Sequence, residues 1–209
     1  LANQSKIPRL NKLMIAPFHL QRSLIDKVEK TAQAAAQGVA SRIILKMNTL
    51  TDEKLMEALV HAGQAGVQID LIIRGACMLP AQRPGVTDNI RVRSIIGRFL
   101  EHSRVFYFRI GNDESLYLSS ADWMNRNMLR RVELAWPVED VALRQRVIDE
   151  CLVAYLHDNV DAWSLNADGQ YTRVQPVKPK RTSAKTADPI PTPLHGAQAA
   201  LMVLYAAKS

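Results

Sequence analysis

Apolar residues recur along this chain with two periods, one typical of helices and one typical of buried strands. Residues 20–37 carry apolar side chains at helical spacing, and Gly38 follows where a helix would end. Residues 42–47 and 68–73 are almost continuously apolar, as strands covered on both faces are. Together with a short apolar run at 13–16, they predict strands that alternate with helices in a parallel sheet with right-handed crossovers.

A second helix is expected between the later two of these strands. Thr51 is predicted to cap it, Asp52 and Glu53 favour its positive N-terminal end, and Gly66 lies beyond its last turn. The pattern after it predicts a long loop at 76–89, strands at 90–95, 100–108, 116–120 and 131–136, and helices at 139–156 and 197–207. The predicted fold is α/β: a mixed sheet with a parallel βαβαβ part, followed by antiparallel hairpin strands and flanked by helices.

The composition divides the chain into four parts. Residues 1–12 are mostly polar and predict a linker, and because the chain opens on Leu rather than Met, we expect an upstream domain before it. Residues 13–170 form the expected globular domain. Residues 171–193 are rich in proline and lysine and predict a mobile or extended linker, and 194–209 predict a short C-terminal helix.

The charge of the chain favours polyanionic partners. Its formal net charge is +7 and its pI is near 9.6, although a solvated basic face is the plainer explanation of such values. The central region is rich in arginine, the side chain best matched to phosphate: Arg74, Arg91, Arg93, Arg98, Arg104, Arg126, Arg130 and Arg131. Cys77 and Cys151 have no metal-ligand spacing, and no signal peptide or bilayer-spanning run is present, which predicts a cytoplasmic protein, with peripheral membrane association as an open alternative.

Chemistry-bearing residues gather in one predicted hairpin. His102 and Arg104 lie two apart in the expected strand at 100–108, so both side chains should leave the same face. The turn at 111–113 should return Ser120 and Asp122 to the neighbourhood of His102. An imidazole, a guanidinium, a hydroxyl and a carboxylate together suit chemistry on a phosphoryl group. A buried, hydrogen-bonded core histidine is the structural alternative for His102.

Topology adds Arg74 to the candidates. Ligands of open parallel sheets bind at the carboxyl ends of the strands, and Asn48 and Arg74 directly follow two of the predicted strands. A surface arginine that staples the loop is the alternative reading. Asp122 is expected either to orient a catalytic partner or to cap the turn at Trp123, and Trp123 and Trp136 are expected in the core.

Longer strings of sequence resemble one family. The HxR pair followed by SxD is similar to a diverged half of the phospholipase D signature, HxK followed by GSxN. The strings NTLTDEKLMEAL, AGVQIDLIIRGACML, NIRVRSIIGRFLEHSRVFYF and YLSSADWMNRNMLRRVEL resemble the C-terminal catalytic domain of bacterial polyphosphate kinases over about residues 12–165. This resemblance implies a phospholipase D-like fold and reversible transfer of the terminal phosphate of ATP to inorganic polyphosphate.

The resemblance also implies site residues and partners. His102 in FLEHSR and Arg74 in LIIRG match positions that contact ATP phosphates in the family, whereas the phosphorylated histidine and most ligands of Mg²⁺ belong to an upstream half. Arg104, Ser120 and Asp122 are expected to support the imidazole. ATP or ADP, polyphosphate and a second copy of the chain are the implied partners, with no specific nucleic acid. A phospholipase D-like phosphodiesterase or nuclease half-site, and a non-catalytic polyanion-binding module, remain the alternatives.

Overall fold

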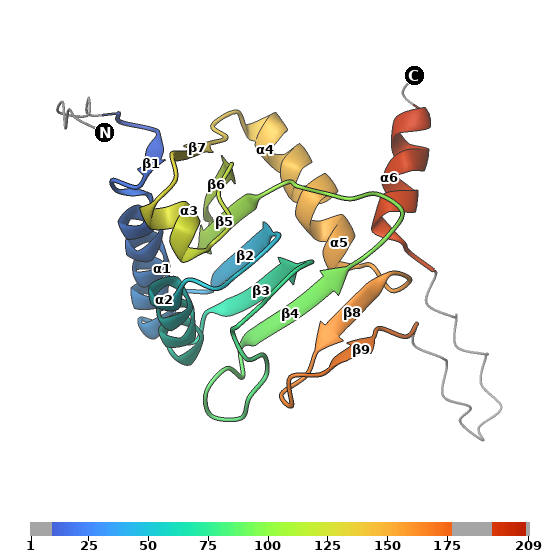
Figure 1. Cartoon of the computed structure of the whole chain (residues 1–209), viewed down its shortest axis with the longest axis horizontal. Coiled ribbons are helices and arrows are strands. Elements are labelled where there is room, and N and C mark those ends of the chain that lie inside the picture. Colours follow the sequence, from blue (N-terminus) through green and yellow to red (C-terminus); the bar gives the residue numbers. More distant parts are fainter. Residues whose placement is uncertain (1–9, 177–193, 208–209) are drawn as a thin grey trace.

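In this computed structural model, residues 10–176 and 194–207 are described, and nine strands among them form one mixed sheet (Figure 1). The sheet order is β1-β7-β6-β5-β2-β3-β4-β8-β9. The strands are β1 (Met14–Ala16), β2 (Ser41–Met47), β3 (Gln68–Ile73), β4 (Ile90–Ile95), β5 (Val105–Ile110), β6 (Asp113–Ser119), β7 (Glu133–Pro137), β8 (Ala162–Leu165) and β9 (Tyr171–Arg173). The helices are α1 (Leu20–Ala36), α2 (Glu53–Gln64), α3 (Asn125–Leu129), α4 (Val141–Val147), η1 (Ile148–Val153), α5 (Ala154–Leu156) and α6 (Ala197–Ala206).

The strand β2 lies at the junction between the parallel and antiparallel parts of the sheet. It pairs in parallel with β3, which pairs in parallel with β4, and on its other edge it pairs antiparallel with β5. The mixed α/β sheet is therefore confirmed. One adjacency differs from the expected βαβαβ unit: β1 runs in the same direction as β2 but lies at the far edge, paired antiparallel with β7.

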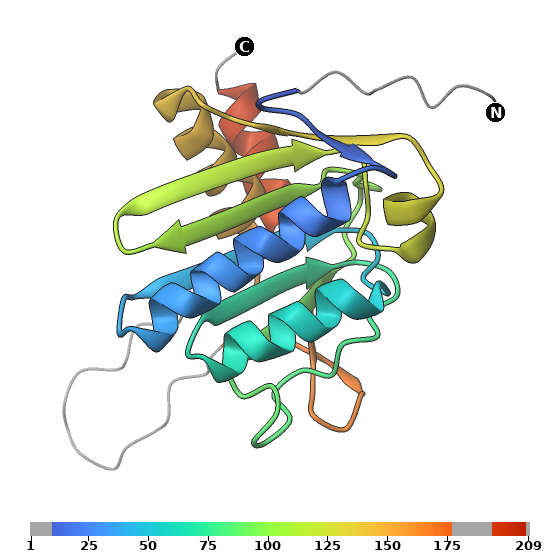
Figure 2. The same ribbon diagram turned by 90° about the vertical axis from the view of Figure 1, so that its left-hand side faces the viewer.

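Two layers of helices cover the sheet because successive strand residues point to opposite faces. In β2, Ile43 and Leu45 join the core beneath α1, α2 and α3, while Ile44 joins the core beneath the continuous helix α4-η1-α5. Figure 2 shows α1 and α2 lying side by side across their face of the sheet. Lys46, which shares the face of Ile44, is a charged residue under the second layer, and this position matters for the site.

Several expected boundaries are wrong. The strands expected at 116–120 and 131–136 lie at Asp113–Ser119 and Glu133–Pro137. The strand at 100–108 begins only at Val105, so 100–104 belongs to the loop after β4. The cap of α2 is Asp52 rather than Thr51, since the Asp52 carboxylate accepts a hydrogen bond from the backbone N–H of Leu55. The sheet extends past 170, because β9 pairs with β8 through the register Trp163↔Arg173.

Two further expectations concern the core and the C-terminal region. Trp123 is fully buried against Phe106, as expected, but Trp136 is 39% exposed because it lines an open cavity between β7 and α4. The helix expected at 139–156 is present as α4-η1-α5, with a π-helical turn at its centre. The predicted linker at 177–193 lies outside the described residues. None of the described helices combines the length and hydropathy of a membrane-spanning segment.

Candidate functional site

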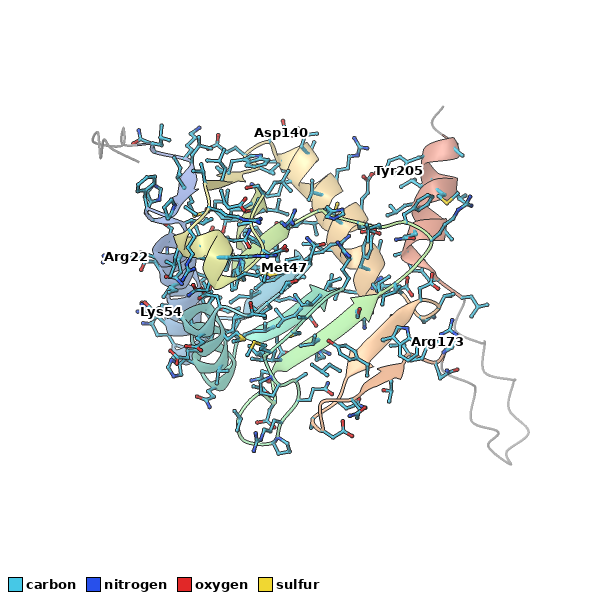
Figure 3. The ribbon with its side chains drawn as sticks, in the orientation of Figure 1. Arg22, Met47, Lys54, Asp140, Arg173 and Tyr205 are labelled. Atoms are coloured by element: carbon cyan, nitrogen blue, oxygen red, sulfur yellow. The ribbon has the colours of Figure 1, made fainter. Side chains whose placement is uncertain are left out.

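Three segments that are far apart in sequence meet at the carboxyl ends of β2 and β3. They are the residues that directly follow these two strands, the loop from β4 to β5, and the segment that follows β6. Met47, the last residue of β2, is labelled near the centre of Figure 3 and marks this end of the sheet. Asn48 and Arg74 therefore meet at the carboxyl ends of the parallel strands, where the sequence places the candidate site.

Arg74 is held by one edge of its guanidinium. Its Nε–H donates to Asn48 Oδ1 and to the carbonyl oxygen of Glu101, both at 2.6 Å. Its Nη atoms have no hydrogen-bond partner in the described part of the chain, so they remain available for an anion. Gly75 allows the close approach behind it, because a Cβ there would lie 2.7 Å from the carbonyl oxygen of Asn48.

His102 is exposed in the loop rather than buried in the core. It directly follows Glu101, whose carbonyl oxygen binds Arg74, so the imidazole-bearing residue and the guanidinium are tied to the same short stretch of backbone. The cavity beside them, lined by Asn48, Arg74 and Ser103 among others, has a volume of about 20 Å³ and has room for about one water-sized group. This cavity is therefore too small to enclose a phosphate group together with its neighbours in a chain.

Arg104 is engaged in structural contacts through all three of its nitrogen atoms. Nε and Nη2 donate to the two carboxylate oxygens of Asp122 at 3.1 and 3.0 Å, and Nη1 donates to the carbonyl oxygen of His102 at 2.9 Å. Arg104 therefore fixes the backbone of His102 rather than offering a free clamp for phosphate. The expectation that both side chains leave one face of a strand is wrong, because neither residue lies in β5.

Asp122 and Ser120 have different surroundings. The Asp122 carboxylate, 8% exposed as a residue, also accepts from the backbone N–H and the side-chain amide of Asn48. It joins the end of β2 to the loop that carries His102, and its carboxylate does not cap the turn at Trp123. Ser120, in contrast, donates to Glu133 and accepts from the backbone N–H of Leu134, so its hydrogen bonds lead away from His102 towards β7.

Glu101 is the centre of a cluster that sequence reasoning missed. Its Oε2 accepts from Lys46 Nζ at 2.6 Å, and its Oε1 accepts from the Tyr155 hydroxyl at 2.6 Å and from the Gln198 amide at 2.7 Å. Lys46 also lies 3.2 Å from the ring centroid of Tyr155. The cluster connects β2, α5 and α6 to the residue that precedes His102. The one available signal was Lys46, a charged residue within an otherwise apolar strand.

Burial and charge set the protonation of this cluster. Burial lowers the pKa of Lys46, and attraction to Glu101 opposes this shift without cancelling it. Burial alone would raise the pKa of Glu101, but Lys46 and the hydrogen bonds from Tyr155 and Gln198 outweigh it, so the pKa is lowered. Burial and the hydrogen bond to Glu101 raise the pKa of Tyr155. The carboxylate therefore stays ionised and the phenol stays protonated at neutral pH.

The described residues do not by themselves form a site for the implied Mg²⁺. No group of three or more His, Cys, Asp or Glu side chains gathers within 10–176 and 194–207. Asp122, whose carboxylate pairs with the arginine of the loop that carries His102, is saturated by Arg104 and Asn48. What the arrangement offers is a partly free guanidinium bound to the stretch of backbone that carries an exposed histidine, which suits binding of a phosphate group rather than of a metal.

Comparison with known proteins shows which family the chain belongs to. The family described as "Polyphosphate kinase C-terminal domain 2" matches residues 13–185. A polyphosphate kinase of Pseudomonas aeruginosa is 50% identical over 197 residues, which cover 93% of this chain and 28% of that protein. A polyphosphate kinase of Pseudomonas putida is 51% identical over 177 residues, 85% of this chain and 24% of that protein. The chain thus spans about a quarter of the length of these relatives.

Solved structures agree with the sequence comparisons. The crystal structure of polyphosphate kinase from Porphyromonas gingivalis matches with a TM-score of 0.84 and 32% identity, over 98% of this chain and 29% of that chain. Nuc of Salmonella typhimurium, a phospholipase D family member, matches with a TM-score of 0.51 and 13% identity, over 78% of this chain and 97% of that one, which shows a shared fold. The chain belongs to the polyphosphate kinase C-terminal domain family and has a phospholipase D-like fold.

Proposed function

We propose that this chain is the C-terminal catalytic part of an enzyme that reversibly transfers the terminal phosphate of ATP to inorganic polyphosphate. In this proposal, Arg74 and His102 bind phosphate groups of the nucleotide. The observation that carries it is the arrangement of Arg74, whose Nε–H is fixed by Asn48 and by the carbonyl oxygen of Glu101, the residue before the exposed His102, while its Nη atoms remain available. Phosphoryl transfer depends mainly on such positioning and on cations that spread the charge of the transferred group.

The transfer is proposed to proceed in two steps. A histidine nitrogen supplied by a segment upstream of this chain attacks the γ-phosphorus, an N–P bond forms, the bond to the β,γ-bridging oxygen breaks, and ADP leaves with that electron pair. A terminal oxygen of polyphosphate then attacks the same phosphorus and the N–P bond breaks. His102 acts opposite the nucleophile as a proton donor or as a phosphate ligand, and its exposure is compatible with both roles.

The supporting residues have narrower roles than the site residues. Arg104 and Asp122 fix the loop that carries His102, through the bidentate ion pair and the bond to the His102 carbonyl oxygen. Ser120 supports β7 and Glu133 instead. Mg²⁺, if it takes part with ATP, would be held mainly by the phosphates and by groups outside the described residues.

The test is polyphosphate synthesis by the protein expressed at the full length that its gene encodes. Arg74→Ala and His102→Ala should each lower kcat/KM for ATP about 100-fold or more, the scale for losing one charge-stabilising group in a transition state. Arg83→Ala and His61→Ala are matched controls, because both side chains are exposed on other parts of the molecule. The controls should stay within about two-fold of the wild type.

The outcome separates the proposed reaction from the alternatives. Near-normal synthesis in both Arg74→Ala and His102→Ala would remove these residues from the mechanism. Nicking of DNA without ATP-dependent polymer formation would favour a phospholipase D-like hydrolase. Binding of polyphosphate without either activity in the full-length protein would favour a non-catalytic module.

A further inference from the structure

The first turn of α6 is docked on the loop that carries His102. The Gln198 amide accepts from the backbone N–H of Phe99 at 2.8 Å and donates to the Phe99 carbonyl oxygen at 2.9 Å. It also donates to Glu101 Oε1 at 2.7 Å. The side-chain amide thus binds both backbone groups of Phe99, as a neighbouring strand would. Gln198 lies 99 positions from Phe99 and 97 from Glu101 in the sequence.

The first turn of α6 is closely packed against the loop. Gln198 is 8% exposed and Ala197 is fully buried, whereas Val203 on the same helix is 71% exposed. The backbone N–H of Ala197 donates to Asp158 Oδ2 at 2.7 Å, which anchors the first turn. A Cβ at Gly97 would lie 2.5 Å from Gln198 Oε1, so the loop approaches the amide as closely as a glycine allows. Tyr205, labelled on α6 in Figure 3, donates to Glu150 and holds the far end.

The Gln198 contacts lead directly to the two proposed site residues. Glu101, which receives the Gln198 amide on its carboxylate, receives Arg74 on its carbonyl oxygen. The next residue is His102. A shift of Glu101 therefore moves the support of Arg74 and the backbone of His102 together. The cluster with Lys46 and Tyr155 holds the carboxylate from the β2 and α5 sides, and Gln198 holds it from the side of α6.

We propose that Gln198 is a positioning residue that sets the relative placement of Arg74 and His102 for phosphate binding, and that α6 is part of the catalytic unit. This inference rests on the proposed function. Residue 198 lies beyond the segment 13–185 that matches the family, so the match itself assigns it no role. Small displacements of such groups lower rates strongly, because phosphoryl transfer depends on alignment.

The test combines a structural and a kinetic measurement on Gln198→Ala. In the 209-residue chain, amide hydrogen exchange at Phe99 should become at least about ten-fold faster, because its acceptor is lost. In the full-length protein, kcat/KM for ATP should fall about ten-fold. Val203→Ala, an exposed position on the same helix, should leave exchange and kcat/KM within about two-fold of the wild type.

A double variant separates positioning from general destabilisation. If Gln198 acts through Arg74, then adding Gln198→Ala to the Arg74→Ala variant should lower kcat/KM for ATP by less than a further factor of about two. The reason is that the effects of substitutions at residues that act as a unit are not additive. A full additional ten-fold loss would overturn the positioning role. Gln198→Glu keeps the acceptor for Phe99 but loses both donated bonds and faces Glu101 with like charge, so it should retain slow exchange at Phe99 and still lose kcat/KM.

The failures of this inference and of the proposed function are distinguishable. Wild-type protein that makes no polyphosphate would defeat the proposed function and with it the positioning role, whatever the exchange data show. Wild-type activity with Gln198→Ala and Gln198→Glu both within two-fold of it would overturn only the inference. If Gln198→Ala does not fold, Gln198→Glu alone decides by the same two-fold limit.

Discussion

Glu101 binds four other side chains, three through its carboxylate and one through its carbonyl oxygen. Its ion pair with Lys46 is largely removed from solvent, since the two side chains are 22% and 8% exposed. Removing one partner of such a pair leaves a buried charge without compensation, which costs far more than the pair contributes. The energetic consequence of a change at Glu101 therefore comes mainly from the lysine that is left behind.

Glu101→Gln should lower the free energy of unfolding by about 3 kcal/mol at pH 7, measured by urea denaturation of the chain. The pKa of Glu101 in the folded state is below its ordinary value of 4.5, so its contribution is present above pH 4.5 and is lost as the pH falls through the lower folded-state value. The difference between wild type and variant should accordingly shrink below pH 4.5.

A surface ion pair provides the control for this prediction. Lys12 and Glu139 are paired at 2.6 Å but are 66% and 60% exposed. Glu139→Gln should change the free energy of unfolding by less than about 0.5 kcal/mol at pH 7. Equal effects of the two substitutions, or a Glu101→Gln effect that does not change with pH, would contradict the role given to burial.

The central strands were predictable because their apolar runs reflect burial on both faces, and β3 and β4 begin and end where the sequence indicates. The loop at 100–104 was not. Its composition is typical of a strand, but side chains rather than a neighbouring strand bind its backbone: Glu101 is bound by Arg74 and His102 by Arg104, and Phe99 just before the loop is bound by Gln198. Side-chain pairing over such separations leaves no periodic signal in one sequence.

Part of the candidate site was also predictable from the sequence. Arg74 follows from strand topology and His102 from its motif, and the structure ties both to Glu101. The cluster around Glu101 was missed because its members come from four separate elements. The strand β9 was missed because it is three residues long and exposed at the edge of the sheet, and β8 was missed because four residues are too few to show a period.

The start of α2 illustrates how one capping residue joins two helices. Asp52 is 1% exposed, caps Leu55 and accepts two hydrogen bonds from the side chain of Gln21 on α1, at 3.0 and 2.8 Å. Asp52→Ala should lower the free energy of unfolding by about 2 kcal/mol, at the upper end for a cap, because the Gln21 amide also loses its acceptor. Urea denaturation of the chain measures this loss.

Asp140 supplies the matched control, since it caps Leu143 of α4 from an exposed position without a partner helix. Figure 3 labels it at the start of α4. Asp140→Ala should lower the free energy of unfolding by about 1 kcal/mol or less. Equal losses for the two substitutions would show that the contact between α1 and α2 through Asp52 contributes nothing.

The chain combines a net charge of +7 with an arginine at the candidate site, Arg74. Polyanion binding should therefore depend strongly on salt. If about four phosphate groups are neutralised, the affinity of the chain for long-chain polyphosphate should fall about 100-fold between 50 and 200 mM salt, as measured by fluorescence titration. Binding that does not depend on salt would contradict an electrostatic site.

A substitution at the site should change this dependence in a defined way. Arg74→Ala should reduce the slope of log K against log salt by about 1, because one phosphate contact is lost. Arg83→Ala, on the exposed loop between β3 and β4, should leave the slope nearly unchanged. A slope that responds equally to both would indicate diffuse attraction to the basic surface instead of a contact at Arg74.

The docking of α6 also bears on when the site becomes complete. His102 leaves the ribosome well before Gln198, and the 96 positions between them (198 − 102) take about 5 to 20 seconds to translate. Throughout that interval the loop lacks the amide that holds Phe99 and Glu101. If Gln198 positions Arg74 and His102 as proposed, the nascent chain carries an unfinished phosphate site until α6 has been synthesised.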